Sequence, residues 1–369
     1  MKKRFIFMIG VLLLWCCVLA GCEQKEELPE QFPSATAGNS GSSLLSSESG
    51  YDMMTDVFEV TEYHPQCFSE FYCPPSLLSG EYLLSGQKNA ATVSADTFEE
   101  KELDFFAYEL QADKDNYYWM FWEAEDQTVD EDLAQRRIEV KLMQTNKETL
   151  DSRVLLTIED GSSVMTRLSI YDSFLVWLEE HGDEEPLWYI QKYDLKTGEL
   201  STVATTDYMF SPYLKLKIRN GWLAYAKMEN GKYRIYCSNI TEGVQVKTEL
   251  LLDTEPVSLV TTGDLLLYSD DTGVSLFQLS NGEQDQIDKK GTDVDFLGNR
   301  YAVFMSGFEM NIYDLEQQRL VYQSDENDGK NYVNWFNVSE DGTKAIFSTY
   351  EPEERERAYY ITTIATVRE

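Results

Sequence analysis

Acidic side chains are the most abundant groups in this chain that could do chemistry. The 369 residues include 65 Asp and Glu but only 31 Lys and Arg, so the formal net charge is −34. Paired carboxylates can hydrolyse glycosidic bonds, and clustered carboxylates can bind Ca²⁺. With so many acids, neighbouring carboxylates arise by chance. Their positions, rather than their number, must therefore indicate a site.

Acidic residues concentrate in three segments, which we expect to form the loops of one face. The members of this candidate acidic face are Glu123, Asp126, Asp130, Glu131 and Asp132, then Glu180, Asp183, Glu184 and Glu185, and finally Glu351, Glu353 and Glu354. A site for a cationic partner or for Ca²⁺ is the functional interpretation. The alternative is that these are solvated loops whose charge aids solubility.

Other catalytic and metal-binding patterns are missing from the sequence. The chain has two histidines, His64 and His181, so it offers no zinc-ligand spacing and no convincing Ser-His-Asp arrangement. The segment from Asp325 to Gly329 suggests a calcium loop, but it departs from the EF-hand pattern, with Trp335 at position twelve. We expect no catalytic residues, no metal and no cofactor, with Ca²⁺ as the alternative.

The N-terminus carries the pattern of a secretory signal. Three basic residues precede an apolar run over 5–18, and Leu19-Ala20-Gly21-Cys22 follows at once. This pattern resembles the lipobox of bacterial lipoproteins, which implies that Cys22 is acylated and becomes the first residue of the mature chain. A transmembrane anchor is the alternative, but it needs roughly 20 apolar residues.

The resemblance implies a protein held at the bacterial cell membrane on its extracytoplasmic side. We expect a signal peptide over 1–21 and a flexible tether over 22–50, which is rich in Ser, Gly, Glu and Pro. Removing the three basic residues of the signal changes the net charge from −34 to −37. Such a charge argues against nucleic acid as a partner, and it makes the acyl chains the contact with the bilayer. We expect a monomer.

Three cysteines remain beyond the signal and the lipidation site. Cys67 and Cys73 are six residues apart and could form a disulfide, since the extracytoplasmic side permits oxidation. Two free thiols are the alternative. Cys237 lies within a strand pattern, where a small buried hydrophobic residue is expected.

A repeat runs through residues 104–369. Two apolar residues followed by an aromatic one recur six times, and a turn-forming residue stands five positions before each aromatic. The aromatic column is Phe121, Trp177, Tyr225, Tyr268, Phe304 and Phe347. Four short strands in each unit of about 40–45 residues is typical of propeller blades. The sequence therefore predicts an all-β fold, a six-bladed β-propeller whose inter-blade core contains these aromatics.

One unit resembles a known repeat family. Val338-Ser339-Glu340-Asp341-Gly342 and the strand that follows to Ser348 are similar to the Ser-x-Asp-Gly-x-x-x-x-Phe core of TolB-like propellers, which are relatives of the WD-repeat families. The resemblance implies a propeller with a binding role, and it transfers no catalytic residue. Residues 51–103 would form an N-terminal segment with the closing strand, for which Glu81–Ser85 is the best candidate. Alternatively, residues 66–103 supply much of a seventh blade.

Together these patterns predict a lipid-anchored propeller of the cell envelope. We expect a non-catalytic binding or scaffold protein whose ligand is a protein or an envelope component. The alternative is an extracellular carbohydrate-active hydrolase or lyase that uses carboxylates in the central pocket. The two hypotheses differ in whether carboxylates face one another across a concave pocket.

Overall fold

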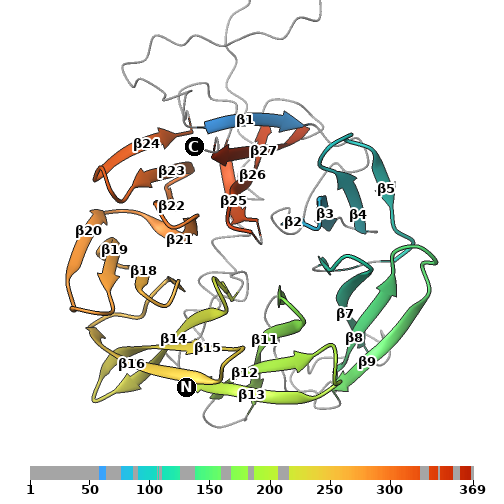
Figure 1. Ribbon diagram of the computed structural model, residues 1–369, viewed down its shortest axis with the longest axis horizontal. Helices are drawn as coiled ribbons and strands as arrows, with labels where there is room; N and C mark the ends of the chain where they lie inside the picture. The colour runs from blue at the N-terminus through green and yellow to red at the C-terminus, as the bar shows by residue number, and fades with distance from the viewer. Residues whose placement is uncertain are drawn as a thin grey trace, which may run out of the picture. The chain divides into compact units, whose positions relative to one another are not determined.

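The computed structural model describes residues 58–63, 76–85, 90–105, 107, 110–124, 138–158, 168–181, 187–206, 216–324, 332–339, 341–351 and 358–366. These residues form a ring of seven antiparallel sheets around a central axis (Figure 1). The fold is therefore a β-propeller with seven blades. The prediction of six blades is wrong, and the seven-blade alternative is confirmed.

We number the blades in chain order. Blade 1 contains β2 (Ser76–Leu78), β3 (Glu81–Ser85), β4 (Ala90–Ser94) and β5 (Glu100–Glu102). Blade 2 contains β6 (Leu110–Ala112), β7 (Asn116–Ala124), β8 (Ile138–Asn146) and β9 (Ser152–Ile158). Blade 3 contains β10 (Ser169–Tyr171), β11 (Phe174–His181), β12 (Leu187–Asp194) and β13 (Leu200–Thr206).

Blade 4 has three strands, namely β14 (Trp222–Glu229), β15 (Lys232–Asn239) and β16 (Val244–Leu252). Blade 5 contains β17 (Ser258–Thr261), β18 (Leu265–Asp270), β19 (Gly273–Gln278) and β20 (Gln284–Asp288). Blade 6 contains β21 (Thr292–Leu297), β22 (Tyr301–Ser306), β23 (Glu309–Asp314) and β24 (Arg319–Gln323). Blade 7 contains β25 (Tyr332–Val338), β26 (Lys344–Glu351), β27 (Ala358–Thr366) and, outermost, β1 (Phe58–Tyr63).

The ring is closed by β1, which comes from the N-terminal side of the chain. This strand pairs with β27 from Phe58 opposite Thr366 to Tyr63 opposite Ile361. The segment Glu81–Ser85 is not the closing strand. It is β3, which lies between β2 and β4 in blade 1.

The aromatic repeat does not include blade 1, because the residue equivalent to the aromatic one is a leucine in this blade. Leu84 in blade 1 is equivalent to Trp177 in blade 3. Each lies opposite the residue that stands three positions before the end of the third strand of its blade. Leu84 is fully buried, so the position is still part of the core. A repeat defined by aromatic residues therefore leaves out this blade.

The same register corrects one member of the aromatic column. Trp177, Tyr225, Tyr268, Phe304 and Phe347 are buried as predicted, but Phe121 is 38% exposed. Trp119 holds the equivalent place in blade 2, because it lies opposite Met143, three residues before Asn146. Trp119 is 6% exposed and stacks on Phe105 with ring centroids 4.7 Å apart.

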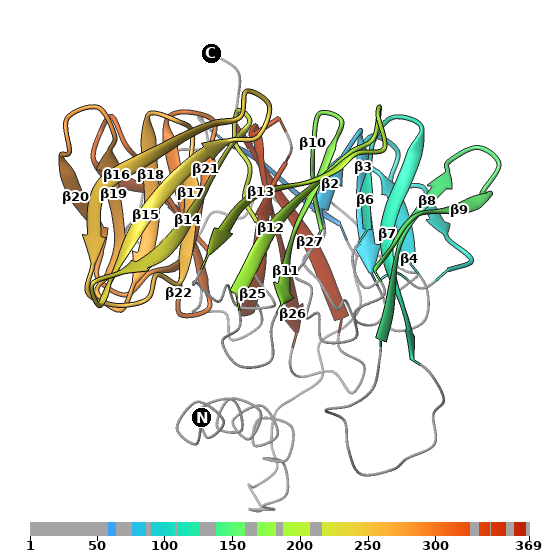
Figure 2. The same ribbon diagram turned by 90° about the horizontal axis from the view of Figure 1, so that it is seen from below.

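The ends of the strands define two faces of the ring. We call one of them the turn face; there the first strand of a four-stranded blade connects to the second, and the third connects to the fourth. We call the other the loop face; there the second strand connects to the third, and each blade connects to the next (Figure 2). Tight turns form the turn face. In blade 3, Asp194 Oδ1 accepts hydrogen bonds from the backbone N–H groups of Lys196 (2.7 Å) and Thr197 (3.2 Å), and Gly198 then takes a φ of +74°. Such Asx turns with a positive φ give a hairpin the tight reversal it needs.

Candidate functional site: the central channel and the loop face

The three acidic segments emerge from the loop face. Glu123, Glu180 and Glu351 stand at the loop-face ends of β7, β11 and β26. The other members of the candidate acidic face lie outside the described residues, as do Cys22, Cys67, Cys73 and the segment from Asp325 to Gly329. Blades 2 and 3 are neighbours, but blade 1 separates blade 2 from blade 7. The three blades that carry these segments would be consecutive in the predicted six-bladed ring, but blade 1 interrupts them in the seven-bladed ring.

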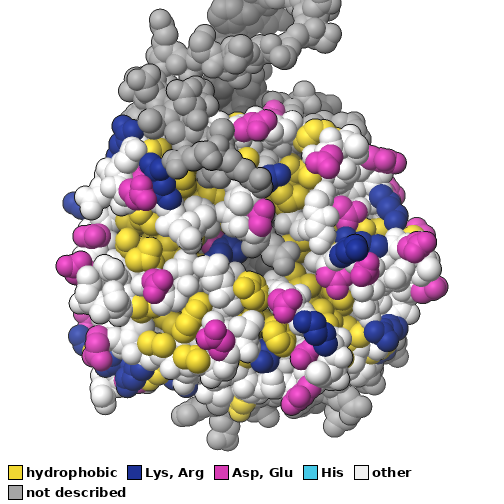
Figure 3. Space-filling view, viewed as in Figure 1, with side chains coloured by type: hydrophobic (Ala, Val, Ile, Leu, Met, Phe, Trp, Pro, Cys, Tyr) yellow, Lys and Arg dark blue, Asp and Glu magenta, His cyan; other side chains and the backbone are white. Residues whose placement is uncertain are grey.

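The inner strands enclose a narrow channel along the axis. The cavity there has a volume of about 50 Å³, which is room for a few water molecules. Its walls carry polar side chains from several blades, including Ser76, Gln111, Ser169 and Asn337. The space-filling view down the axis shows cationic and acidic side chains gathered at the centre of the ring (Figure 3).

Lys217 crosses the channel from blade 4 to blade 6. Its Nζ forms an ion pair with Asp293 Oδ1 and donates hydrogen bonds to the Val294 carbonyl oxygen (2.5 Å) and to Ser258 Oγ (3.2 Å). The ammonium also lies 5.3 Å from the centroid of the Phe336 ring, within the range of a cation–π interaction. One side chain thereby links the segment before β14 to the inner strands of blades 5, 6 and 7.

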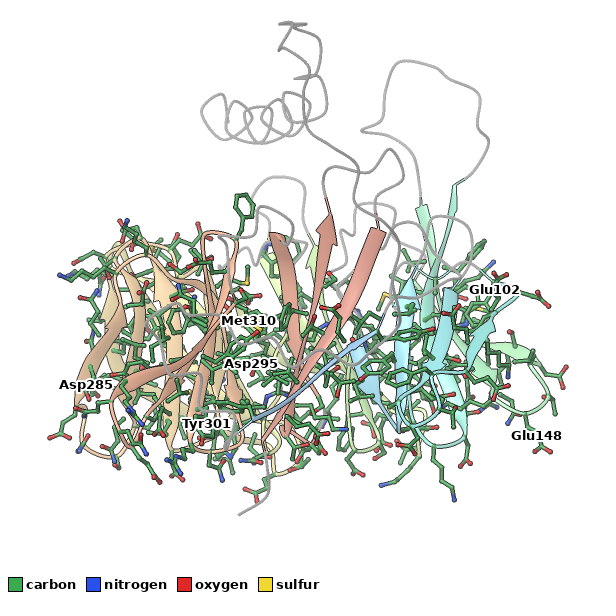
Figure 4. The ribbon with its side chains drawn as sticks, turned by 90° about the horizontal axis from the view of Figure 1, so that it is seen from above. Glu102, Glu148, Asp285, Asp295, Tyr301 and Met310 are labelled. Carbon is green, nitrogen blue, oxygen red and sulfur yellow. The ribbon has the colours of Figure 1, made fainter. Side chains whose placement is uncertain are left out.

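Arg219 makes a second crossing two residues later. Its Nε and Nη2 donate to the two carboxylate oxygens of Asp295, at 2.9 and 2.6 Å. Asp295 lies deep within the ring (Figure 4), and its side chain is 3% exposed. Its Oδ1 also accepts the backbone N–H of Phe296 at 2.8 Å. A bidentate pair of this kind fixes geometry as well as charge.

The residues of the two channel ion pairs follow a sequence pattern that the positions of acidic residues alone do not reveal. Lys217-Ile218-Arg219 and Asp293-Val294-Asp295 each place two like charges around one buried apolar residue. In extended backbone, residues two apart point to the same side. Asp293 departs from this geometry, because it is the bulged residue of β21 with a φ of +25°. The opposite signs of the two triplets make them complementary.

The chemistry available to the channel is limited by these ion pairs. The carboxylates of Asp293 and Asp295 each form an ion pair, with Lys217 and Arg219 respectively. Within the described ranges no group of three or more His, Cys, Asp or Glu is arranged to hold a metal, and no helix is long and apolar enough to cross a membrane. These ion pairs tie the blades together.

A second charged cluster lies toward the loop face of blade 4. Hydrogen bonds from Tyr236, Lys247 and Arg234 lower the pKa of the Glu229 carboxyl to about 2. Lys247 Nζ is 3.0 Å from each Glu229 oxygen, and Arg234 Nε is 2.8 Å from Oε2. The Tyr236 ring stacks on Tyr225 with centroids 5.6 Å apart. All of these donors converge on one carboxylate, which indicates a structural network.

No protein-family model and no curated protein matches this sequence. Among solved structures, an oligogalacturonate lyase in complex with manganese is 14% identical, with a TM-score of 0.41, and the match covers 79% of this chain and 74% of that one. A chain of a mitotic checkpoint complex is 12% identical, with a TM-score of 0.49, and covers 94% of this chain and 100% of that one. Likenesses this distant concern the fold alone and carry no argument about activity.

Proposed function

We propose that this chain is a lipid-anchored β-propeller of the bacterial cell envelope that binds a protein or an envelope component without catalysis. The observation that carries the proposal is the state of the channel. Its carboxylates are engaged in the pairs Lys217–Asp293 and Arg219–Asp295, around a cavity of about 50 Å³. A carbohydrate-active enzyme needs facing carboxylates and room for a sugar ring between them.

The loop face is the proposed binding surface. Among the connections from a second to a third strand, the longest belong to blades 2, 3 and 7, and they contain most of the acidic residues in question. Loops held by a rigid scaffold are where binding residues concentrate in many folds. The acidity of these loops favours a cationic partner, because a negative field of several kT speeds the association of positive molecules.

The family proposal rests on the last blade. Ser339 Oγ donates to Asp341 Oδ1 at 2.6 Å and accepts the Lys344 backbone N–H at 2.9 Å, and Phe347 is 2% exposed. Ser339, Asp341 and Phe347 of the Ser-x-Asp-Gly-x-x-x-x-Phe pattern thus each have a defined structural role in this turn and strand. This supports a TolB-like propeller, a class in which binding is the common activity.

The test is the salt dependence of association. The partner is first isolated with the tethered protein from its own cells, and association is then measured over a salt series. Replacing Asp130, Glu131 and Asp132 by Asn, Gln and Asn should slow association at low salt by about tenfold, with the difference shrinking as the Debye length falls to about 8 Å at 0.15 M. The melting temperature should stay nearly constant, since exposed charges contribute less than about 1 kcal/mol each. An association rate that ignores both salt and the triple substitution would exclude the acidic loops as the binding surface.

The proposed anchor has its own test. Cys22→Ser removes the thiol that the lipobox presents for acylation. We expect the variant to move from the membrane fraction to the soluble fraction or to retain its signal, and we expect the wild-type N-terminus to show the mass of attached acyl chains. An unmodified Cys22 in the protein purified from its own cells would refute the anchor.

A further inference from the structure

The outer strands of the blades differ in how well they could pair with another strand. Unpaired N–H and C=O groups on an edge strand can template the addition of a further strand, and β-bulges or very short strands prevent this. In blades 2 to 6 the pairing of the outermost strand with its neighbour shifts register, at the positions Leu142/Met143, Ile190/Gln191, Arg234/Tyr236, Val274/Ser275 and Ile312/Tyr313. Blade 1 ends in a three-residue strand, Glu100–Glu102, in which every residue is charged. Six of the described blades thus carry a device that blunts the edge.

The seventh edge has neither a register shift nor a three-residue strand, and its charged residues are Glu59 and Glu62. Along its whole length of six residues, β1 pairs with β27 in one continuous register, without a shift. Both of its ends are fixed by aromatic contacts on opposite sides of the sheet. Phe58 meets Tyr301 of blade 6 edge-on, with ring centroids 5.3 Å apart, and Tyr63 stacks on Phe98 of blade 1 at 4.8 Å. The outer edge of β1 is therefore a regular strand held in place before any partner arrives.

The side chains of β1 define what could pair with it. Glu59, Val60 and Glu62 are exposed, Val60 by 52%, and Thr61 is half-buried. The two glutamates are three residues apart, so they point to opposite faces of the sheet. Opposite charges directly across two strands are favourable, and like charges are unfavourable.

We propose that the outer edge of β1 binds an extended segment of a partner protein, which adds a strand to blade 7 and carries basic residues three apart. In an antiparallel pairing, one Lys or Arg would lie opposite Glu62 and another, three residues later, opposite Glu59. β-Branched residues between them would face Val60 and Thr61. Main-chain hydrogen bonds would supply the affinity, and the two charges would supply register and specificity.

A second copy of this chain is a poorer occupant. If β1 paired with its own copy about the centre of the strand, each Glu59 would lie opposite the Glu62 of the other copy. The two glutamates in each of these pairs would repel each other. The charges therefore act against self-association and select a basic strand. This edge is on the outer wall of the ring, so the inference does not depend on the acidic loops of the proposed function.

The experiment uses the whole mature chain and a short labelled peptide with two Lys residues three apart among Thr and Val. Fluorescence anisotropy measures binding, and amide hydrogen exchange locates it. We expect the peptide to bind and to slow exchange over 58–63. Methylating the peptide nitrogens on the pairing edge should abolish binding, because these N–H groups are the proposed donors.

Charge exchange gives the matched control. Glu59→Lys with Glu62→Lys should weaken binding of the Lys peptide by about tenfold or more. A peptide with Glu in place of both Lys should bind this variant better than it binds the wild type. Glu148→Lys with Glu249→Lys changes the net charge equally at two exposed sites elsewhere, and it should leave binding within about twofold. The melting temperature of each variant tests whether the ring is intact. The hydrogen-exchange experiment with peptide uses the wild-type protein and therefore does not depend on any variant.

Several outcomes would overturn the proposal. These are no binding at millimolar peptide, binding that survives nitrogen methylation, exchange protection outside 58–63, or equal losses in the two double variants. A concentration-dependent dimer of the wild-type chain that protects 58–63 would assign the edge to self-association instead.

Discussion

At the scale of single residues, the channel ion pairs are contacts whose loss should be costly. Removing two charges from water costs several kcal/mol per ion, and only good geometry with further hydrogen bonds offsets that cost. Arg219 and Asp295 meet this condition through two short bonds to the guanidinium and one to the Phe296 N–H. The pair is therefore costly to break from one side, because the remaining charge would stay buried.

We predict that Arg219→Met lowers the free energy of unfolding by about 3–5 kcal/mol, since it leaves the Asp295 carboxylate buried without its cation. The matched control is Lys232→Met. Lys232 pairs with Asp253 at 2.7 Å, but the side chains are 49% and 80% exposed, so the loss should stay below about 1 kcal/mol. Urea unfolding measures both. Equal losses would mean that the channel pair contributes no more than a surface pair.

Residue-level predictions from the sequence succeeded where periodicity decided them. The apolar-apolar-aromatic pattern placed five of its six aromatics in the core, because a second strand buried on both faces leaves little freedom in register. It placed Phe121 wrongly, since blade 2 offers two aromatics two residues apart on the same side of β7. Only pairing with β8 shows that Trp119 is the equivalent residue. The channel residues were missed because Lys217 and Asp293 are distant in sequence and meet only across a closed ring.

At the scale of secondary-structure elements, ring closure depends on β1. The strand buries Phe58 against the core of blades 6 and 7, where Tyr301, Leu297 and Ile364 are its neighbours in one hydrophobic cluster. The closing strand was expected within residues 51–103, and β1 lies in that range. The identity of that strand was not predictable, because its six residues carry a weak alternating pattern and Glu81–Ser85 is the more apolar segment.

We predict that Phe58→Ala costs about 3–5 kcal/mol, the range for truncating a buried aromatic side chain. Val60→Ala, on the same strand but 52% exposed, should cost less than about 1 kcal/mol. The melting temperatures of the two variants compare the contribution of the buried Phe58 side chain with that of an exposed side chain on the same strand. If Phe58→Ala melts at the wild-type temperature, another part of the chain must close the ring.

At the scale of the whole molecule, the two faces of the propeller differ in what they can offer a partner. The turn face consists of short hairpins, and the chain enters the ring there at Phe58, which lies opposite Thr366. The loop face carries the connections that leave β7, β11 and β26. The loop face is therefore the surface on which we propose that a partner binds.

The most direct test of this account is site-specific photo-cross-linking in the native cells. A photoreactive amino acid replaces Asp130 in the connection between β7 and β8 on the loop face, or Glu242 in the tight turn between β15 and β16 on the turn face. Both variants should fold normally, because both positions are in connections between strands. We expect a covalent adduct with a protein or envelope component from position 130 and none from position 242. Adducts from position 242 alone, or equally from both positions, would contradict binding through the loop face.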